Sequence, residues 1–323
     1  MSVYSPINPA ALVPGLPGND DSWEGLADNA RYLYAASTVG GYAPLIAAGS
    51  LVADDGTVPS VTGTGSDDVC AVAVPKNADN QPLQLIVMGD VDSGDTGRWT
   101  LTYDGGAGTA ATTSTSDTSY TSCTATPTGS GHPRTATVAV AGGSAGDVVR
   151  TRSVVFRLLP TVTASGTEAS GYVYPEPHGM YQTSRPVSSE RVARLINGPA
   201  KIAADRPACI YTHIEYLGHT GARASMSASS SDWVTVARAN LAMIEAEPRT
   251  YRVSMYLTAD TSGSPVPACK VTISNQTVSA TAAGWTHGTV TLGGATPVMT
   301  VNLKRSSGSN NVYLKTLQVM REP

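Results

Sequence analysis

Hydrophobic and polar residues alternate with a period of two through most of the chain after residue 50. Because successive side chains of an extended strand point to opposite faces, this alternation predicts half-buried β-strands. Clusters of Gly, Asp, Asn and Pro separate the runs and predict the turns between them. The clearest predicted strands are Leu83–Met88, Trp99–Tyr103, Thr135–Val140, Val149–Leu158, Tyr251–Thr258, Lys270–Ile273 and Met299–Leu303. Many short strands at regular spacing predict antiparallel sandwiches or barrels.

The alternation stops between about Ala164 and Pro186, where Pro175 and Pro177 also occur. A Pro-rich segment without strand periodicity is typical of a connection between domains. The sequence therefore predicts an all-β chain with two tandem antiparallel β-sandwiches, preceded by an extended arm and one short α-helix. The predicted divisions are an N-terminal segment at 1–48, a first sandwich at 49–162, a connector at 163–186 and a second sandwich at 187–323.

The two predicted sandwiches share an order of motifs. The first contains GRWTLTYDG, then YTSCTATP, then RTATVAVAGGSAGDVVRTRSVVFRLLP. The second contains PACKVTISN, then GWTHGTVTLG, then PVMTVNLKRSSGSNNVYLKTLQVMREP. Each series gives a strand, a strand and a final pair of strands joined by a Gly, Ser or Asn turn. This order predicts that the two sandwiches are copies of one strand plan at low identity.

Residues 19–36 predict one short amphipathic helix ahead of the β-strands. Asp20 or Asp21 can cap it, and its apolar residues recur at spacings of three and four. Two heptads are marginal alone in water, so the apolar stripe needs a partner surface. Folding back on the first sandwich is one alternative; the favoured one is oligomerisation or docking. The residues predicted to form that contact are Trp23, Leu26, Ala30, Leu33 and Tyr34.

The leader before this helix carries Pro6, Pro9, Pro14 and Pro17, which favour an extended arm. No Lys or Arg precedes Arg31, so the basic region of a secretory signal is missing and a targeting role is not expected. No apolar run reaches the roughly 18 residues that cross a bilayer, so no membrane insertion is expected.

Composition narrows the class of protein. Charged residues make up 14% of the chain, against about 25% in an average protein, while hydrophobic residues make up 41%. A chain of 323 residues with this content can bury a sizeable core. The net charge of −4 provides no basic field for phosphate backbones, so nucleic acid is not an expected partner.

The titratable residues give no catalytic pattern. The five histidines are accompanied by no Ser-His-Asp order, no H-E-x-x-H and no nucleophile elbow. The carboxylates are scattered, and no pair is marked as the acid and base of a glycosidase. We therefore expect no enzyme activity and no catalytic residues. The histidines are His132, His178, His213, His219 and His287.

The four cysteines fall two in each predicted sandwich: Cys70 and Cys123 in the first, and Cys209 and Cys269 in the second. Their spacing does not match a zinc site. Each pair could close a disulfide within its domain, but free buried thiols are favoured because no secretory signal precedes them.

One turn carries a candidate ion site. Asp90, Asp92 and Asp95 cluster between two predicted strands, and oxygen-rich loops of this kind can hold Ca²⁺. The order of residues along this turn differs from that of an EF-hand loop, which would have a bidentate Glu at the position of Leu101. A solvated Asp/Gly hairpin turn is the favoured alternative, so no cofactor is expected.

The second sandwich resembles the jelly-roll carbohydrate-binding modules. The resemblance rests on Trp285, which opens a strand, and on the final strand pattern from Asn310 to Val319, with Lys315 where that family often has Asp. It implies a jelly-roll-like fold. Sugar binding uses exposed aromatic side chains that stack on pyranose rings. The candidate glycan contacts are Trp233, Tyr172, Tyr174 and Tyr181.

The segment from Asp20 to Tyr34, D-D-x-W-x-x-L-x-D-N-x-x-Y-L-Y, resembles the N-terminal attachment segments of tailed-bacteriophage virion proteins, such as tail-fibre and head-decoration proteins. The resemblance implies a non-enzymatic virion protein, assembled in the host cytoplasm, whose N-terminus binds other virion proteins. Its β domains would project outward, often as a homotrimer. The alternative function is a module that binds a host surface glycan, and a glycan-active enzyme is a third, weaker hypothesis.

Overall fold

The computed structural model describes residues 45–75, 81–112, 120–159, 168–169, 172–173, 209–241, 248–293 and 297–322. The chain divides into two compact units. One comprises Met1–Pro44, Leu159–Arg206 and Pro323, and the other comprises Leu45–Leu158 and Pro207–Glu322. The predicted helix at 19–36, with Trp23, Leu26, Ala30, Leu33 and Tyr34, lies outside the described residues, as do Tyr174 and Tyr181.

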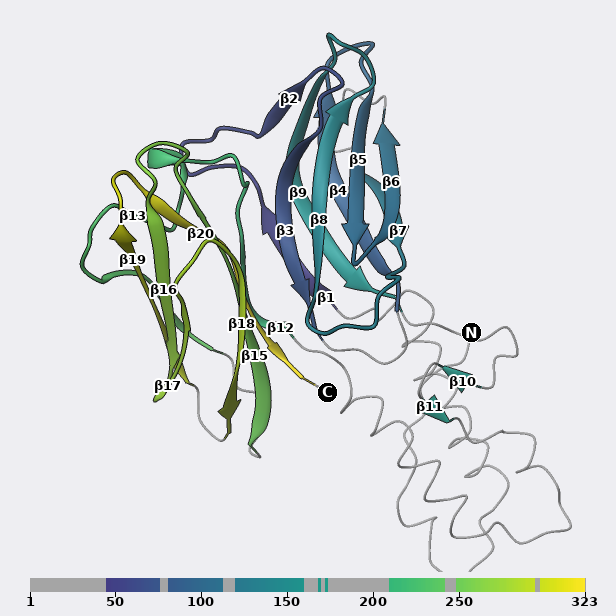
Figure 1. Ribbon diagram of the computed structural model, residues 1–323. Helices are drawn as coiled ribbons and strands as arrows, with labels where there is room; N and C mark the ends of the chain where they lie inside the picture. The colour runs from purple at the N-terminus through teal and green to yellow at the C-terminus, as the bar shows by residue number, and fades with distance from the viewer. Residues whose placement is uncertain are drawn as a thin grey trace, which may run out of the picture. The chain divides into compact units, whose positions relative to one another are not determined.

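The first β-sandwich consists of two antiparallel sheets (Figure 1). One sheet has the order β1 (Leu45–Ser50), β9 (Val148–Leu158), β4 (Leu83–Val91) and β7 (Tyr120–Ala125), and the short β2 (Ser60–Thr62) also pairs with β9. The other has the order β3 (Asp67–Val74), β8 (Arg134–Gly142), β5 (Gly97–Tyr103) and β6 (Gly106–Thr112).

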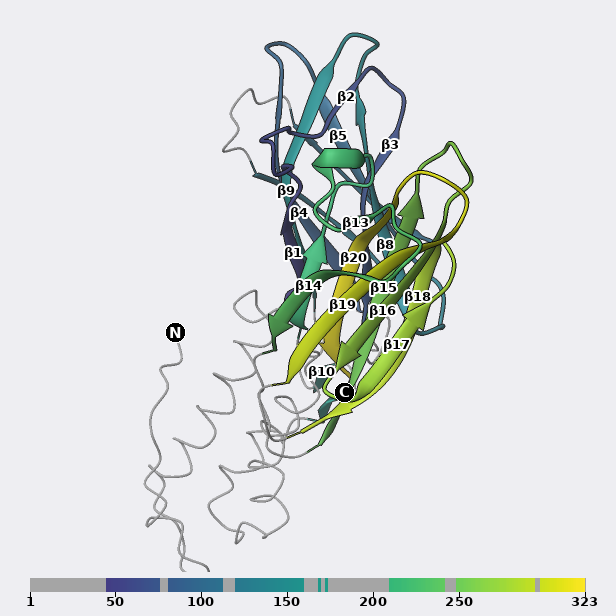
Figure 2. The same cartoon turned by 90° about the vertical axis from the view of Figure 1, so that its left-hand side faces the viewer.

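The second β-sandwich is built in the same way (Figure 2). Its first sheet has the order β12 (Cys209–Ile214), β20 (Val312–Arg321), β15 (Arg249–Ala259) and β18 (Gly284–Leu292), and β13 (Ser227–Ala228) also pairs with β20. Its second sheet has the order β14 (Val234–Asn240), β19 (Val298–Ser307), β16 (Val266–Ile273) and β17 (Gln276–Ala280).

The two sandwiches have one strand plan. Taken in chain order, β12 to β20 occupy the same places in their sheets as β1 to β9 occupy in theirs. When the short β2 and β13 are set aside, each set of eight strands follows the order of a jelly roll. The predicted all-β fold with two tandem antiparallel sandwiches is confirmed, and so is the predicted internal duplication.

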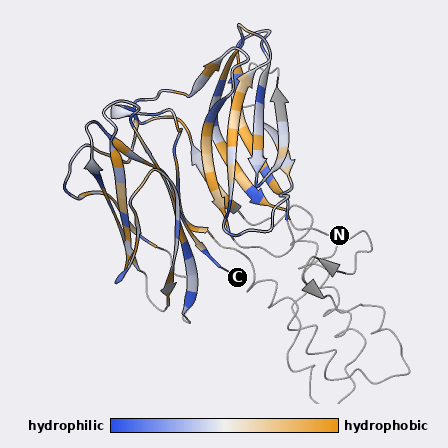
Figure 3. Cartoon of the chain, in the orientation of Figure 1, coloured by the Kyte–Doolittle hydropathy of each residue, from blue (hydrophilic) through white to orange (hydrophobic). Residues whose placement is uncertain are grey.

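The hydrophobic residues of the alternating pattern point inward and form the two cores. In β8, the residues from Arg134 to Gly142 are alternately buried and half-exposed, as a strand with one covered face requires. Hydrophobic residues lie along the strands of both sandwiches, with polar residues between them (Figure 3). The largest buried side chain, Trp99, donates its indole N–H to Thr151 Oγ1 at 2.7 Å, so its one polar atom is satisfied inside the first core.

Two details differ from the sequence prediction. The predicted boundary at residue 48 falls inside β1, whose pairing with β9 attaches residues 45–50 to the first sandwich. The predicted connector contains a small hairpin, in which β10 (Glu168–Ala169) pairs with β11 (Tyr172–Val173). Strands of two residues are too short to produce a visible alternation, which explains why the sequence did not predict them.

The edge of β3 is completed by the second sandwich. The Val69 carbonyl accepts a hydrogen bond from Leu217 N at 3.0 Å, and the Ala71 carbonyl accepts one from Thr316 Oγ1 at 2.7 Å. Ala73, two residues further along the same edge, is bonded to Gln318. An open strand edge can pair with other chains, and these contacts cover it.

The Gln318 side chain holds two edge strands at once. Its Oε1 accepts from Ala73 N at 2.7 Å, and its Nε2 donates to the carbonyls of Ala73 at 3.2 Å and Ile46 at 3.3 Å. Gln318 is fully buried, so these bonds are shielded from water. Through this one amide, β20 of the second sandwich binds both β3 and β1 of the first.

Apolar side chains extend the same contact. Ile214 and Met320 of the second sandwich belong to the core cluster of the first, and Cys209, Tyr216 and Trp285 pack against that cluster. Because one core crosses from the first sandwich into the second, the two jelly rolls form one compact unit rather than separate domains on a linker.

Candidate functional site

Trp233 lies on the outer face of the sheet β14-β19-β16-β17. Val234 pairs with Leu303, which points into the core, so the neighbouring Lys304 points to the opposite, outer face. Trp233 precedes Val234 and therefore comes level with Lys304. The Trp233 residue is 38% exposed, and it is one of few large hydrophobic residues at the surface of the described chain.

Two lysines lie against the indole of Trp233. The Nζ of Lys270 is 4.4 Å from the centroid of the ring and that of Lys304 is 4.8 Å away. Ammonium groups at this distance are attracted to the ring by its quadrupole. The register explains the arrangement, because Lys270 on β16 pairs with Asn302 on β19, two residues from Lys304 on the same face.

The rest of this outer face is polar. Thr235 Oγ1 donates to Asn302 Oδ1 at 2.8 Å, and the hydroxyls of Thr272 and Thr277 lie 3.0 Å apart. We call the outer side of these four strands, with Trp233, Lys270, Lys304 and Asn302, the Trp233 face. An exposed ring surrounded by hydroxyls, an amide and ammonium groups can stack on a sugar and bond its polar substituents.

The equivalent face of the first jelly roll is different. In β5 the aromatic residues Trp99 and Tyr103 point into the core, while Thr100 and Thr102 point outward. In β8 the outward positions are Thr and Ala. Among the described residues of that sheet, no aromatic side chain is exposed. Between these two equivalent sheets, the described residues place an exposed aromatic side chain on the second copy alone.

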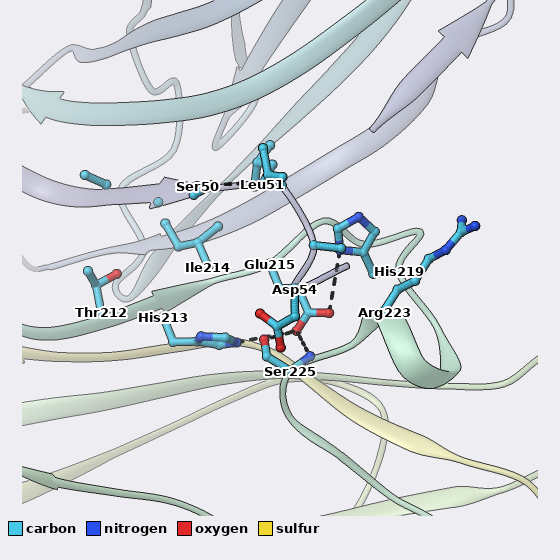
Figure 4. Close-up of a pocket in the computed structure, with 14 residues that line it drawn as sticks. Ser50, Leu51, Asp54, Thr212, His213, Ile214, Glu215, His219, Arg223 and Ser225 are labelled. Atoms are coloured by element: carbon cyan, nitrogen blue, oxygen red, sulfur yellow. Dashed lines mark hydrogen bonds and ion pairs between the residues drawn. The ribbon is translucent and has the colours of Figure 1, made fainter. Parts of the chain in front are cut away.

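A cavity of about 300 Å³ lies beside β12, between residues 48–54 of the first sandwich and residues 212–225 of the second. Figure 4 shows Glu215 within it, facing His213, Ser225 and His219. Both the N–H and the Oγ of Ser225 donate to Glu215 Oε2, at 3.3 and 3.2 Å. Glu215 is 5% exposed, which makes it a buried carboxylate at the junction of the jelly rolls.

Lys315 is the counter-ion of Glu215. Its fully buried Nζ donates to Glu215 Oε1 at 3.2 Å and to the carbonyl of His219, and it lies 4.9 Å from the ring centroid of Tyr313. Burial lowers the pKa of Lys315, although Glu215 opposes that shift. Burial raises the pKa of Glu215, but the neighbouring His213 side chain and the charge and hydrogen bond of Lys315 outweigh it, and the net direction is down. The pair is therefore a buried ion pair.

Two imidazoles flank this ion pair. His213 Nε2 is 3.6 Å from Glu215 Oε2, and His219 Nδ1 is 3.9 Å from Glu215 Oε1. Burial lowers the pKa of His219, so its ring is neutral at neutral pH. Neither distance is that of an aligned general base, and the hydroxyl of Ser225 is directed to Glu215 rather than to either ring. The absence of enzyme activity stays a prediction.

In the turn that was the candidate ion site, arginines pair with two of the three carboxylates, and Asp90 is buried rather than solvated. Asp90 accepts from Arg150 Nη1 at 2.9 Å and from Arg152 Nε at 3.0 Å. Asp92 accepts from Arg150 at 2.7 Å, and Asp95 Oδ2 accepts from the N–H of Val148 at 2.7 Å. These carboxylates therefore stabilise the first sandwich through ion pairs and a backbone hydrogen bond.

We expect removal of divalent ions to leave this protein unchanged. Because Asp90, Asp92 and Asp95 already have protein donors, adding EDTA in excess should not shift the melting temperature in differential scanning calorimetry. Readdition of Ca²⁺ is the control. A melting temperature that falls with EDTA and recovers with Ca²⁺ would contradict the assignment of this turn to ion pairing.

The four cysteines are free thiols, the favoured alternative; Cys70 and Cys269 are buried as expected, whereas Cys123 and Cys209 are only half-buried. Burial raises the pKa of Cys209 to about 11 and that of Cys269 to about 12, and it also raises the pKa values of Cys70 and Cys123. Thiols with raised pKa values are poor nucleophiles and metal ligands at neutral pH. Their role is packing.

His287 makes the stability of the second jelly roll sensitive to pH. Its Nδ1 lies 2.9 Å from Ser254 Oγ, and its ring stacks on Trp285 with centroids 5.4 Å apart. Burial, with a further contribution from the charge of Arg252, lowers the pKa of His287 to about 4. The unfolded chain binds this proton near pH 6.5, so between those values the unfolded state binds more protons and stability falls as the pH falls.

We therefore expect the melting temperature to drop between pH 7 and pH 5, and to drop less in the variant His287→Gln. Carboxylates remain ionised over this range, so they add little to the difference. Gln can keep a hydrogen bond to Ser254, which makes it the conservative replacement. If the melting temperatures of the parent chain and the variant fall by the same amount, the pKa of His287 is not lowered by its surroundings.

No model of a known protein family matches this chain, and no curated protein does. Among solved structures it is similar to the N-terminal CBM22-1–CBM22-2 tandem domain of Paenibacillus barcinonensis Xyn10C, at 12% identity over 87% of this chain and 98% of that one, with a TM-score of 0.27. A turret protein of Sulfolobus turreted icosahedral virus matches at 10% identity over 82% of this chain and 96% of that one, with a TM-score of 0.14. At these scores the likenesses carry no argument, and the jelly-roll assignment rests on the strand order.

Of the four candidate glycan contacts predicted from the sequence, the structure describes Trp233 and the backbone of Tyr172. Trp233 lies on an exposed, polar face, whereas Tyr172 lies in β11, which belongs to the other compact unit. The described residues contain no helix long and apolar enough to span a bilayer. The sequence did not predict the ion pair of Glu215 with Lys315, because 100 residues separate the two and only the fold brings them together.

Proposed function

We propose that this chain is a non-enzymatic accessory protein of a phage virion, attached through its N-terminal segment, with the two jelly rolls displayed outward. The observation that carries the proposal is the joining of two jelly rolls into one compact unit by the bonds along β3 and by a shared core. A unit of this kind suits a spacer or a decoration protein, because the contacts between its two jelly rolls fix their relative orientation. The resemblance of residues 20–34 to phage attachment segments supplies the proposed location.

The proposal is tested in density-purified particles of the phage that encodes the chain. The full chain should be detected in the particles by immunoblot, and a variant lacking residues 1–44, which leaves β1 intact, should be absent from them. Trp233→Ala is the matched control, and it should be incorporated normally because Trp233 lies on the displayed unit. Finding the full chain only in the unsedimented lysate would refute a virion role.

The oligomeric state provides a second test of the N-terminal segment. If Trp23, Leu26, Ala30, Leu33 and Tyr34 form the assembly contact, light scattering after size exclusion should give a trimer for the full chain. The chain that lacks residues 1–44, with β1 retained, should be a monomer. A monomer in both cases would leave attachment to a partner as the role of the segment and remove self-association.

Glycan binding is a second candidate function, and the Trp233 face favours it. The exposed indole lies on a sheet of hydroxyl, amide and ammonium groups, which is the composition that binds sugars. We expect saturable binding to a glycan panel that is lost in Trp233→Ala. Tyr120→Ala is the control, because Tyr120 is an aromatic residue of the first jelly roll that is 70% exposed. Equal loss in both variants would argue against the Trp233 face as the site.

A further inference from the structure

We infer that the ligand of the Trp233 face is an anionic glycan, one that carries carboxylate, sulfate or phosphate groups. The inference rests on the proposed glycan-binding function and adds the chemical class of the ligand. It follows from the charge of the sheet, from the placement of two lysines against Trp233, and from a comparison of the two jelly rolls.

The sheet that forms the Trp233 face is strongly biased in charge. Its four strands, β14, β16, β17 and β19, contain no Asp or Glu. They contain Arg238, Lys270, Lys304 and Arg305. Arg238 pairs with Thr300 and is exposed on the outer side. The nearest carboxylate in the sequence is Asp232, which precedes the strands. In a chain with a net charge of −4, this sheet concentrates positive charge.

The two lysines lie close to each other as well as to the Trp233 ring. With Nζ atoms 4.4 and 4.8 Å from one ring centroid, the two ammonium groups lie within about 9 Å of each other, a distance at which salt screens their repulsion only in part. No described carboxylate is paired with Lys270 or Lys304. A sugar acid stacked on Trp233 would place its negative group beside both ammonium groups and relieve that repulsion.

The first jelly roll shows what this sheet looks like without the site. Its equivalent strands β5 and β8 present Thr and Ala outward, together with Arg98, and β3 begins with Asp67 and Asp68. The shared strand plan therefore does not require lysines or a surface Trp at these positions. Their presence in the second copy alone indicates a role in binding rather than in folding.

The test uses the full chain and matched pairs of glycans that differ only in charge. The pairs are polygalacturonate and its carboxyl-reduced form, heparin and its desulfated form, and a phosphomannan before and after dephosphorylation. Binding is followed by biolayer interferometry at about 50 mM and about 300 mM salt. We expect binding to one or more acidic members, at least about tenfold weaker binding to the neutral partner, and weakening at high salt.

Variants assign the effect to the two lysines. Lys270→Gln with Lys304→Gln should weaken binding of the acidic glycan by about tenfold or more and flatten its salt dependence. Lys270→Arg with Lys304→Arg, which keeps the charge, should retain binding. Arg98→Gln, on the equivalent face of the first jelly roll, should have no effect. Melting curves verify that each variant is folded.

The outcomes separate this inference from the function on which it rests. Binding that is equal for acidic and neutral members, and still lost in Trp233→Ala, would overturn the anionic class and leave glycan binding standing. Binding to acidic members that survives the double Gln variant would place the charge recognition elsewhere and also overturn the inference. Binding to none of the glycans would refute both.

Discussion

Replacement of Glu215 by Ala is expected to lower the free energy of unfolding by about 3–5 kcal/mol. The substitution leaves the ammonium of Lys315, which is fully buried, without the carboxylate that now lies 3.2 Å from it. It also removes the acceptor for Ser225. Urea denaturation followed by tryptophan fluorescence measures the effect as a lower midpoint with an unchanged slope.

Two controls distinguish the loss of stability caused by breaking the buried ion pair from the loss caused by removing any charged side chain. The double variant Glu215→Leu with Lys315→Met removes both charges and should recover most of the lost stability, because a buried ion pair replaced by apolar residues of similar size costs little. Arg223→Ala breaks the exposed contact of Arg223 with Asp55 at 3.5 Å, leaves the bond from Thr57 to Asp55 in place, and should change the midpoint little. An unchanged midpoint in Glu215→Ala would mean that Lys315 finds another partner or reaches water.

Gln318→Ala should be the second most damaging substitution, at about 2–4 kcal/mol. It leaves the N–H and carbonyl of Ala73 and the carbonyl of Ile46 without their side-chain partner in a buried contact. Because these bonds join the two jelly rolls, calorimetry should show the single unfolding transition of the parent chain separating into two.

Gln276→Ala is the matched control for Gln318. Its amide also makes two hydrogen bonds, to the N–H and the carbonyl of Thr291, but on the exposed β17. Water can replace those bonds, so the loss of stability should be small. If both variants lose the same stability, the contribution of Gln318 to the free energy of unfolding does not depend on its burial between the jelly rolls.

The sequence predicted the strands well because a sandwich imposes a period of two. β8 alternates along its length and β4 does so from Leu83 to Met88, and the duplicated order of motifs corresponds to the duplicated sheet order. β20 shows the limit of this reasoning. Lys315, Thr316 and Gln318 mark a polar side of the strand, yet all ten of its residues are buried. Periodicity tells which face of a strand points away from its own core; it does not tell what covers that face.

The candidate sites were likewise predictable where the signal is local in sequence, and not where the fold brings distant residues together. Trp233 could be singled out from the sequence as an aromatic residue near a strand end, but Lys270 and Lys304 join it only through the order of β14, β19 and β16. Glu215 and Lys315 are separated by 100 residues, and no spacing rule connects them. The one local signal was Lys315 in the final strand, where the jelly-roll pattern often has Asp.

The covered edge of β3 has a consequence for how the chain is made. The bond from Thr316 to Ala71, and those from Gln318 to Ala73, join residues 245 positions apart. At the usual pace of about 5–20 residues per second, the ribosome adds the last strand about 12–50 s after β3 emerges. During that interval the edge of the first jelly roll is bare, so newly made chains in a crowded polysome are exposed to mispairing with one another until β20 arrives.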